Sequence, residues 1–546
     1  MVESVFNQSL LSPGRNLCEK EANNTAGLIQ AQPSTLPRLY FDHRRGYYTS
    51  SVPSSLTKMA TNPSDVADSM RDLQIADNLH PDQDQKTQRS KPTYVTALQD
   101  VTRALTEASG AISLQEQNIS TISDEAIPSK TLSMKEIYSL HSSSKVLSIA
   151  AKSLANSVDA LKDTTEGSII RKLRSLGRQS VAEDSEKRGL ITKLFSHFDK
   201  RIRHTIYVLL DTTSNHNLLW KVAEECYNEA SSEFGALHAS NYFGTQEEGK
   251  REHKSQGRME KEQTWVDHWL TTLNSAPNGP TLFYPPTSLN RSLVFEEPSR
   301  YLFRTFDSGS SGTSNENVIA STASVSRTQE RGRTDLLGIR KNEAAELLRL
   351  HMKKGLFDGY TTDNLMSWTS SLIFAIQYAI RRSEWRETDD IKICVVDTRK
   401  YPQGQFARDT WLIEYFQPID QLPSLAKTCF QFCLSYPDYY NGEYFSQGAV
   451  SIADRSCVTS LKLMEEAGLF KLYPEFQDAD GKKQWANRVR DLRREWSEER
   501  GTSKKEMKLA LQVARTCFPQ LASVDVATAL LTFRNRKLQP WALSGK

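Results

Sequence analysis

Three groups of residues between positions 301 and 452 have types and spacing that could form a reactive site. Arg304 stands alone in the apolar run Tyr-Leu-Phe-Arg, and a hydroxyl-rich turn, Ser-Trp-Thr-Ser-Ser at 367–371, runs directly into an apolar, helix-forming segment. Glu443 opens the strand-like run Glu-Tyr-Phe-Ser-Gln-Gly. A guanidinium pairs with anions, hydroxyls hydrogen-bond polar ligands, and a carboxylate serves as a general acid or base. The sequence therefore supports a site hypothesis in this stretch without settling a function.

Each group also has a structural explanation. Arg304, inside an apolar run, could form a structural ion pair with Glu443 or Asp397. The hydroxyls of 367–371 suit the N-cap of the helix that follows. Glu443 beside a glycine could be a surface residue at the end of a strand. Both interpretations stay open at the level of sequence.

Other catalytic chemistry has little support in the sequence. The chain has no Gly-x-x-x-x-Gly-Lys-Ser/Thr, no Gly-x-Gly-x-x-Gly after a strand, no Gly-x-Ser-x-Gly and no His-Glu-x-x-His. Nothing in the spacing supports His351 as a base for Cys394 or Cys457. Cys429 and Cys433 form the one close cysteine pair, and no second Cys/His pair at zinc spacing accompanies them, so we expect no metal site.

The elements around these residues indicate an α+β domain at 291–480. Strand patterns at 391–397 and 443–452 alternate with helical patterns that begin at Asn342, after the hydroxyl turn, near 418–434 and at 461–468. The strands and helices do not follow a regular βαβ rhythm, which favours α+β over a doubly wound sheet.

The rest of the chain divides by composition and periodicity. We interpret 1–92 as a disordered tail, 93–237 as an α-helical bundle, 238–290 as a linker with a short helix, and 481–546 as a basic helical C-terminal segment. The C-terminal segment carries 15 Lys and Arg against 6 Asp and Glu. Its mixture of Arg and Trp over 482–537 is compatible with nucleic-acid binding, although tryptophans in a core with arginines on a solvated face explain it better.

Periodicity locates the helices of the bundle. Ser133 and Glu136 form a possible capping box ahead of a long helix. That helix carries a heptad seam, which could be a dimer interface or simply pack internally. An earlier helix would place four apolar residues on one face. The seam comprises Leu140, Leu147, Leu154 and Leu161, and the earlier face comprises Tyr94, Leu98, Val101 and Leu105.

Composition bounds the compartment and the partners. The 546 residues have a net charge of +3, which implies no polyelectrolyte partner for the chain as a whole, and a mean hydropathy of −0.55, which suggests ordered domains diluted by polar linkers. Seven scattered cysteines favour reduced thiols. The sequence has no secretory signal and no apolar run long enough to span a membrane, so we expect a cytoplasmic or nuclear protein.

Residues 295–480 resemble an uncharacterised family of fungal proteins with a domain of unknown function. The resemblance is carried by the Arg304 run, the 367–371 turn, the 391–398 strand, Gly-Gln-Phe-Ala at 404–407 and Gly-Glu-Tyr-Phe-Ser-Gln-Gly at 442–448. The members combine this domain with variable helical regions. The resemblance implies family membership and no activity.

A second resemblance is to the ADP-ribosyltransferase fold. Toxin-like members show an arginine on a first strand, a Ser-Thr-Ser turn entering a helix, and a glutamate on a later strand, in that order. The resemblance implies that Arg304 would bind the pyrophosphate of NAD⁺, and that Glu443 would stabilise an oxocarbenium-like transition state. It also implies that Ser367, Thr369 or Ser370 would hold the nicotinamide ribose.

The sequence departs from that pattern in two places. The turn reads Ser-Trp-Thr-Ser-Ser, so three of its hydroxyls compete for the ribose, and Asn441 stands two residues before Glu443 where the family has Glu or Gln. Glu414 is a competing carboxylate. The rival interpretation is a non-catalytic interaction protein whose helical region binds a protein partner and whose α+β domain is structural. The enzyme interpretation requires Arg304, the turn and Glu443 to converge on one cleft.

Overall fold

The computed structural model describes residues 94–126, 132–181, 184–246, 255–284, 297–325, 330–353, 363–386, 390–417 and 424–537. The expected disordered tail, 1–92, lies outside these residues. The described residues form two compact units that divide between residues 161 and 162.

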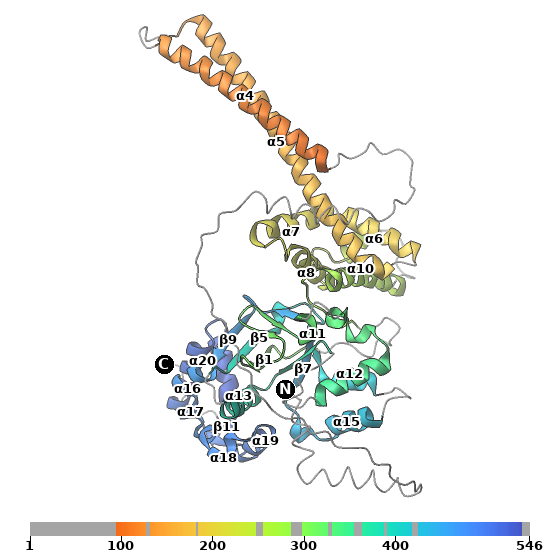
Figure 1. Cartoon of the computed structure of the whole chain (residues 1–546), viewed down its shortest axis with the longest axis vertical. Coiled ribbons are helices and arrows are strands. Elements are labelled where there is room, and N and C mark those ends of the chain that lie inside the picture. The colour runs from red at the N-terminus through yellow and green to blue at the C-terminus, as the bar shows by residue number, and fades with distance from the viewer. Residues whose placement is uncertain are drawn as a thin grey trace, which may run out of the picture. The chain divides into compact units, whose positions relative to one another are not determined.

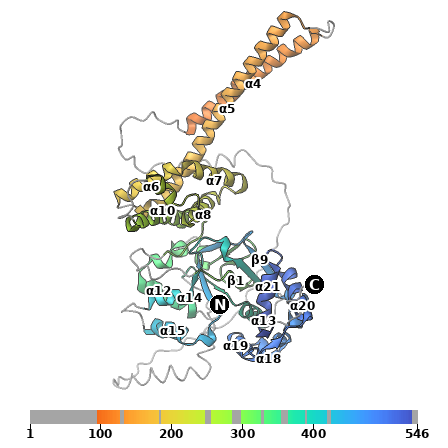
Figure 2. The ribbon, with the colours of Figure 1, turned by 180° about the vertical axis from the view of Figure 1, so that it is seen from behind.

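The first unit is a pair of long helices, α4 (Tyr94–Ala126) and the first part of α5 (Met134–Leu176), which run side by side in Figures 1 and 2. The expected capping box forms at the start of α5: the Ser133 amide donates to the Glu136 carboxylate, and the Glu136 amide donates to the Ser133 hydroxyl at 3.3 Å. The buried face of α4 differs from the expected one, because Leu105 is 52% exposed. Small residues form that face instead, with Val101 among them: Ala97, Val101, Ala104 and Ala108.

Five helices open the second unit and share one core with the end of α5. Trp265 and Trp269 of the last of these helices are fully buried against Phe195 and Phe198. The structure differs here from the expected linker at 238–290, because this helix packs inside the helical core. The five helices are α6 (Ser185–His197), α7 (Asp199–Thr212), α8 (Leu218–Ser231), α9 (Ser240–Gln246) and α10 (Ser255–Ser275).

A six-stranded antiparallel sheet follows, in the order β6-β7-β4-β1-β5-β9. The sheet consists of two three-stranded halves, because β1 and β4 meet at a single register pair, Phe303 with Thr369, whereas β1 pairs with β5 over six residues. The strands are β1 (Tyr301–Phe306), β4 (Leu365–Thr369), β5 (Lys392–Asp397), β6 (Ala407–Arg408), β7 (Glu443–Gln447) and β9 (Ser456–Ser460).

A small three-stranded sheet covers one face of this sheet, which we call the small-sheet face. Leu302, Trp368 and Cys394 on that face pack against Ile319 and Val450 of the small sheet. The expected strand at 443–452 is two strands, because the chain turns at Gly448 with a φ of 68° and its second part joins the small sheet. The small sheet comprises β2 (Thr313–Ser314), β3 (Val318–Ala320) and β8 (Ala449–Ser451), and the short helix α11 (Thr322–Val325) follows β3.

Helices cover the other face, which we call the helical face, in two groups. One group packs on Leu365 and Phe445 and comprises α12 (Lys341–Lys353), α14 (Asp409–Phe416) and α15 (Ser424–Ser435). The other packs on Phe303 and Val395 and comprises α13 (Leu372–Arg386), α16 (Leu461–Glu466), α17 (Leu469–Leu472), α19 (Ala486–Glu495), α20 (Lys504–Cys517) and α21 (Ser523–Leu531).

The C-terminal segment therefore shares its core with the sheet. Trp485 is 1% exposed and stacks on Tyr378 of α13 with ring centroids 5.2 Å apart. The structure differs from the expected boundary at residue 480, because no packing boundary lies there. The smaller elements of this region are α18 (Ala479–Lys482) and the parallel pair β10 (Arg500–Gly501) and β11 (Arg536–Lys537).

In the described part of the chain, no helix combines the length and the apolar character needed to cross a membrane.

Candidate functional site

The strand register places the hydroxyl turn beside the carboxylate that the sequence singled out. Thr369, the last residue of β4, pairs with Glu443, the first residue of β7. Both side chains are on the helical face, because Thr369 is also paired with Phe303, which packs on α13. Glu443 is 7% exposed and Thr369 is 2% exposed. The site lies where the two groups of covering helices meet.

Internal hydrogen bonds hold the turn against the strand of the carboxylate. The Thr369 hydroxyl donates to the carbonyl of Asn441, and the Ser370 amide donates to the carbonyl of Gly442 at 2.7 Å. The Ser370 hydroxyl also lies 3.2 Å from that carbonyl. Ser371 accepts the Phe374 amide at 3.4 Å, as an N-cap residue does. The turn is therefore a helix cap that is tied to β7.

Ser367 takes part in a different interaction from the one expected of it. Its hydroxyl lies 3.0 Å from Nε2 of His351, and Nδ1 of the same ring lies 2.8 Å from Asp363 Oδ1. All three residues are at most 5% exposed. The chain Asp363–His351–Ser367 fixes α12 to β4, and it engages the Ser367 hydroxyl with His351. His351 therefore bonds neither Cys394, which is on the small-sheet face, nor Cys457.

Arg304 is on the opposite face of the sheet from Glu443. Its register partner on β5 is Cys394, which packs on the small-sheet face. The Arg304 guanidinium reaches across the junction of the two half-sheets and donates to the Ser367 carbonyl at 2.7 Å. Its expected alternative partner, Asp397, pairs with Arg399 at 2.7 Å and with Arg300. The structure thus brings together Thr369, Ser370 and Glu443, and it does not bring Arg304 to their face.

A second carboxyl group, which the sequence analysis did not single out, adjoins Glu443. Arg408 of β6 pairs with Tyr444, so Asp409 and Glu443 follow at matching positions one residue further on. Both also act on one thiol: the pKa of Cys433 is raised by its hydrogen bond with Cys429, by burial, and by the charges of Asp409 and Glu443. The two carboxyl groups therefore share one buried region.

Burial raises the pKa of the Asp409 carboxyl group. The residue is 4% exposed, and burial raises its pKa to about 7, against hydrogen bonds from the Thr410 amide and the Tyr440 hydroxyl that favour the charged form. Arg408 in turn donates to the Tyr440 hydroxyl at 2.8 Å. A carboxyl group that titrates near neutral pH beside a second carboxylate is the arrangement expected of a general acid and base.

The cation of this region comes from the C-terminal segment. Arg493 of α19 donates to the Tyr440 carbonyl at 3.0 Å, to the Asn441 side chain at 3.1 Å and to the Ser371 hydroxyl at 3.2 Å. It forms no ion pair within the described residues, and burial lowers its pKa. Arg493 thus bridges the end of the turn and the residues that lead into β7, and it supplies a positive charge that pairs with no carboxylate in the described part of the chain.

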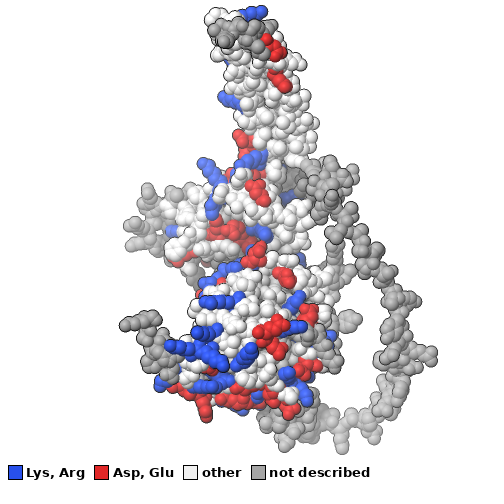
Figure 3. Space-filling model, turned by 90° about the vertical axis from the view of Figure 1, so that its left-hand side faces the viewer, with Lys and Arg blue, Asp and Glu red and all other residues white. Residues whose placement is uncertain are grey.

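Most other arginines of the C-terminal segment have partners. Arg488 pairs with Glu495 at 3.1 Å, Arg494 with Asp438 at 2.9 Å and Arg536 with Glu506 at 3.1 Å. Figure 3 shows basic and acidic side chains side by side on the face that it displays. These pairs reduce the charge available to a nucleic-acid backbone.

The described residues contain no cluster of three or more metal-ligating side chains. The six cysteines among them are free thiols, five of which are buried: Cys226, Cys394, Cys429, Cys457 and Cys517.

Comparison with known proteins yields one match. Residues 297–422 match the model of a family described as a domain of unknown function, DUF7587. The matched stretch covers β1, β4 and Asp409, and it ends before Glu443. Among curated proteins and among solved structures, none matches the chain.

Proposed function

We propose that the domain built on the six-stranded sheet is ADP-ribosyltransferase-like, and that it binds NAD⁺ and cleaves the bond between nicotinamide and ribose with Glu443 as the catalytic carboxylate. The register pair of Thr369 with Glu443 is the observation that carries the proposal. It places a hydroxyl-rich turn and a buried carboxylate together at a strand end, in the order arginine strand, hydroxyl turn, glutamate strand.

The side chains of the site suit each step of that reaction. In the proposed step the C1′–N bond breaks, its electron pair leaves with nicotinamide, and the ribosyl cation that develops lies against the Glu443 carboxylate. An acceptor hydroxyl or water then bonds to C1′, and its proton passes to Asp409, whose pKa near 7 suits a base at neutral pH.

Arg493 replaces Arg304 as the phosphate-binding group in this proposal. Arg304 is on the other face of the sheet, whereas Arg493 contacts the turn at Ser371 and the strand of Glu443 at Asn441. Its Nη atoms donate to protein acceptors, but none of these acceptors is charged, so the positive charge of the guanidinium can attract a pyrophosphate. Arg304 has a positioning role, because it holds the Ser367 carbonyl.

The test uses the full chain with NAD⁺ and follows nicotinamide release. We expect Glu443→Gln to reduce the release rate by a factor of about 100 or more, because removing a catalytic carboxylate typically has an effect of this size. Glu414→Gln is the matched control, since Glu414 is an exposed carboxylate on α14 that contacts none of these groups, and we expect it to leave the rate unchanged. If the native chain neither binds NAD⁺ nor releases nicotinamide, the proposal is wrong.

A second candidate function is that of a non-catalytic interaction protein, and the surface of the helix pair favours it. Large apolar side chains on α4 and α5 are unusually exposed, including Ile112 at 55%, Ile149 at 61% and Tyr138 at 69%. The heptad seam of α5 is also on this unit, which suggests a second copy of the helix pair as the partner. Sedimentation of the full chain and of Ile112→Lys/Ile149→Lys tests this. Self-association that the double substitution abolishes supports it, whereas a monomeric native chain contradicts it.

A further inference from the structure

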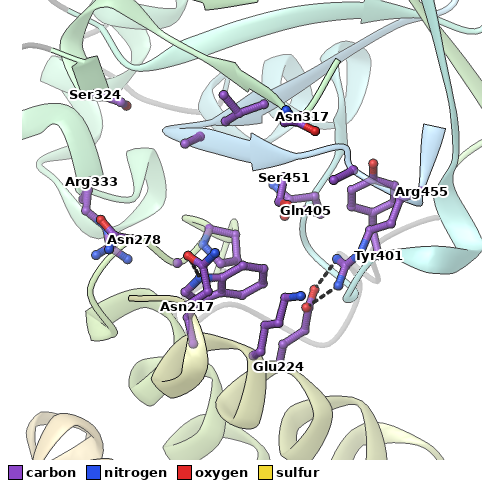
Figure 4. Close-up of a pocket in the computed structure, with 17 residues that line it drawn as sticks. Asn217, Glu224, Asn278, Asn317, Ser324, Arg333, Tyr401, Gln405, Ser451 and Arg455 are labelled. Atoms are coloured by element: carbon purple, nitrogen blue, oxygen red, sulfur yellow. Dashed lines mark hydrogen bonds and ion pairs between the residues drawn. The ribbon is translucent and has the colours of Figure 1, made fainter. Parts of the chain in front are cut away.

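A polar cavity lies within the larger unit, between the helical core and the small sheet. Its volume is about 560 Å³, within the range of small-molecule sites. Helix α8 and the turn at 276–280 form one wall, and β3, β8 and the loop at 401–405 form the other. Figure 4 shows the side chains of both walls pointing into the space between them. The Glu443 site does not contribute to this lining.

The charge of the lining is positive. Arg455 and Glu224 neutralise each other through two parallel hydrogen bonds of 2.7 and 2.6 Å across the two walls. The other two cations, Lys221 and Arg333, form no ion pair with the described residues. Glu224 is the single acidic side chain of the lining, so the cavity carries a net formal charge of +2. A cavity of this charge favours an anion.

Buried polar atoms in the lining lack partners. The Gln405 amide nitrogen and the Tyr401 hydroxyl have no hydrogen-bond partner among the described residues, although the side chains are only 2% and 8% exposed. The Nε atom of Arg333 is also buried and has no hydrogen-bond partner among the described residues. Each such atom destabilises the chain by about 1–3 kcal/mol relative to a paired one, so a ligand that pairs with them gains from doing so.

The rest of the lining is neutral and polar. Ser451 belongs to β8, Asn317 directly precedes β3, and Asn278 belongs to the turn at 276–280. Amides and hydroxyls both donate and accept hydrogen bonds, which is what a ligand with several hydroxyl groups requires. Asn278 has a φ of 58°, a conformation that few residues other than glycine adopt, and it donates to the His216 carbonyl at 3.2 Å. The turn that presents it is therefore fixed.

We propose that this cavity binds a phosphorylated sugar, either free or as the ribose phosphate of a nucleotide. Arg333, with its forked donors, binds the phosphate, and Lys221 adds positive charge. Gln405 and Tyr401 bind the sugar hydroxyls and thereby gain the partners they lack. The proposal is independent of the proposed NAD⁺ chemistry, because the two sites have no residue in common.

The test titrates the full chain by calorimetry with ribose 5-phosphate, AMP and inorganic phosphate. We expect ribose 5-phosphate or AMP to bind, and the stronger of the two identifies the source of the ribose phosphate. Arg333→Gln and Lys221→Gln should each weaken that binding about tenfold, the loss of one charge-assisted contact. Lys471→Gln removes an exposed charge on α17, outside the lining, and should leave binding unchanged.

Three results would overturn the proposal. One is that neither ribose 5-phosphate nor AMP binds at millimolar concentration. The second is that inorganic phosphate binds as tightly as both, because the cavity would then hold an adventitious anion only. The third is that Glu443→Gln weakens binding while Arg333→Gln does not, because the ligand would then occupy the other site. Thermal unfolding of each variant checks that the fold is intact.

Discussion

Asp409 makes the stability of the chain depend on pH. Its pKa is raised by burial to about 7 in the folded chain and returns to its ordinary value near 4 on unfolding. The folded state therefore holds the proton more tightly, so this residue stabilises the fold below about pH 4, and that contribution is lost as the pH rises through 7.

Asp409→Asn should remove this dependence, because the amide keeps the shape of the neutral acid without titrating. We expect the melting temperature of the native chain to fall relative to that of the variant between pH 5 and pH 8. Each kcal/mol corresponds to about 1 °C in a chain of this size, because the unfolding entropy is about 2.1 cal/mol/K per residue. Melting curves across that range check it, with the exposed Asp454→Asn as control. Parallel curves for native and variant chains would show that Asp409 is ionised throughout.

At this same scale the sequence predicted part of the site and missed part for a definite reason. The structure places the hydroxyl turn beside Glu443 and Arg304 on the opposite face of the sheet. Strand β1 is buried on both sides, with Leu302 and Phe303 packing on opposite faces, so its sequence has no polar alternation to show where Arg304 points. Asp409 was missed because it follows a strand of two residues, too short to leave a pattern.

At the scale of elements, the connection into β7 depends on a glycine. Gly442 has a φ of 64°, and a Cβ there would lie 1.9 Å from the Ser370 hydroxyl. The same residue offers its carbonyl to the Ser370 amide. The approach of the hydroxyl turn to the Glu443 strand therefore requires the absence of a side chain at this position.

Gly442→Ala should destabilise the chain by about 1–3 kcal/mol, the combined cost of a left-handed conformation and a displaced Ser370 hydroxyl. Because the turn moves, nicotinamide release should fall as well. Gly189→Ala is the control: Gly189 is in α6, nothing lies within 4 Å of the added Cβ, and the change should be neutral or slightly stabilising. Chemical denaturation of both variants measures the difference, and equal stabilities would contradict the strain argument.

The sequence predicted the positions of several elements, but some of them pack against other parts of the chain than expected. The capping box at Ser133 and the strand at 391–397 lie where local patterns placed them, because caps and apolar runs are local signals. The division of 443–452 between two sheets depends on the turn at Gly448, and the placement of α10 in the helical core depends on its tryptophans. Both are decided by tertiary contacts, which periodicity does not report.

At the scale of the whole molecule, the C-terminal segment shares one hydrophobic core with the sheet. The sequence analysis predicts a domain boundary at residue 480 because the segment after it is rich in Lys and Arg. In the structure, however, Val489, Leu492 and Trp496 are buried together with residues of α13 and β5. The same helix delivers Arg493 to the Glu443 region. A basic surface and a buried apolar stripe belong to one amphipathic helix, so charge alone could not identify a separate domain.

The substitution Trp485→Ala tests whether the C-terminal segment and the sheet share one core. The side chain is 1% exposed and stacks on Tyr378, so its removal should destabilise the chain by about 3–5 kcal/mol through lost burial and the cavity that remains. If the C-terminal helices and the sheet share one core, a single cooperative transition should shift to lower temperature with no separate early phase. Leu425→Ala, at a side chain that is 62% exposed on α15, should change the transition little.

An early transition confined to the C-terminal helices, with the sheet melting at its native temperature, would show instead that 481–537 folds as a separate unit. The proposed delivery of Arg493 by a shared core would then lose its basis.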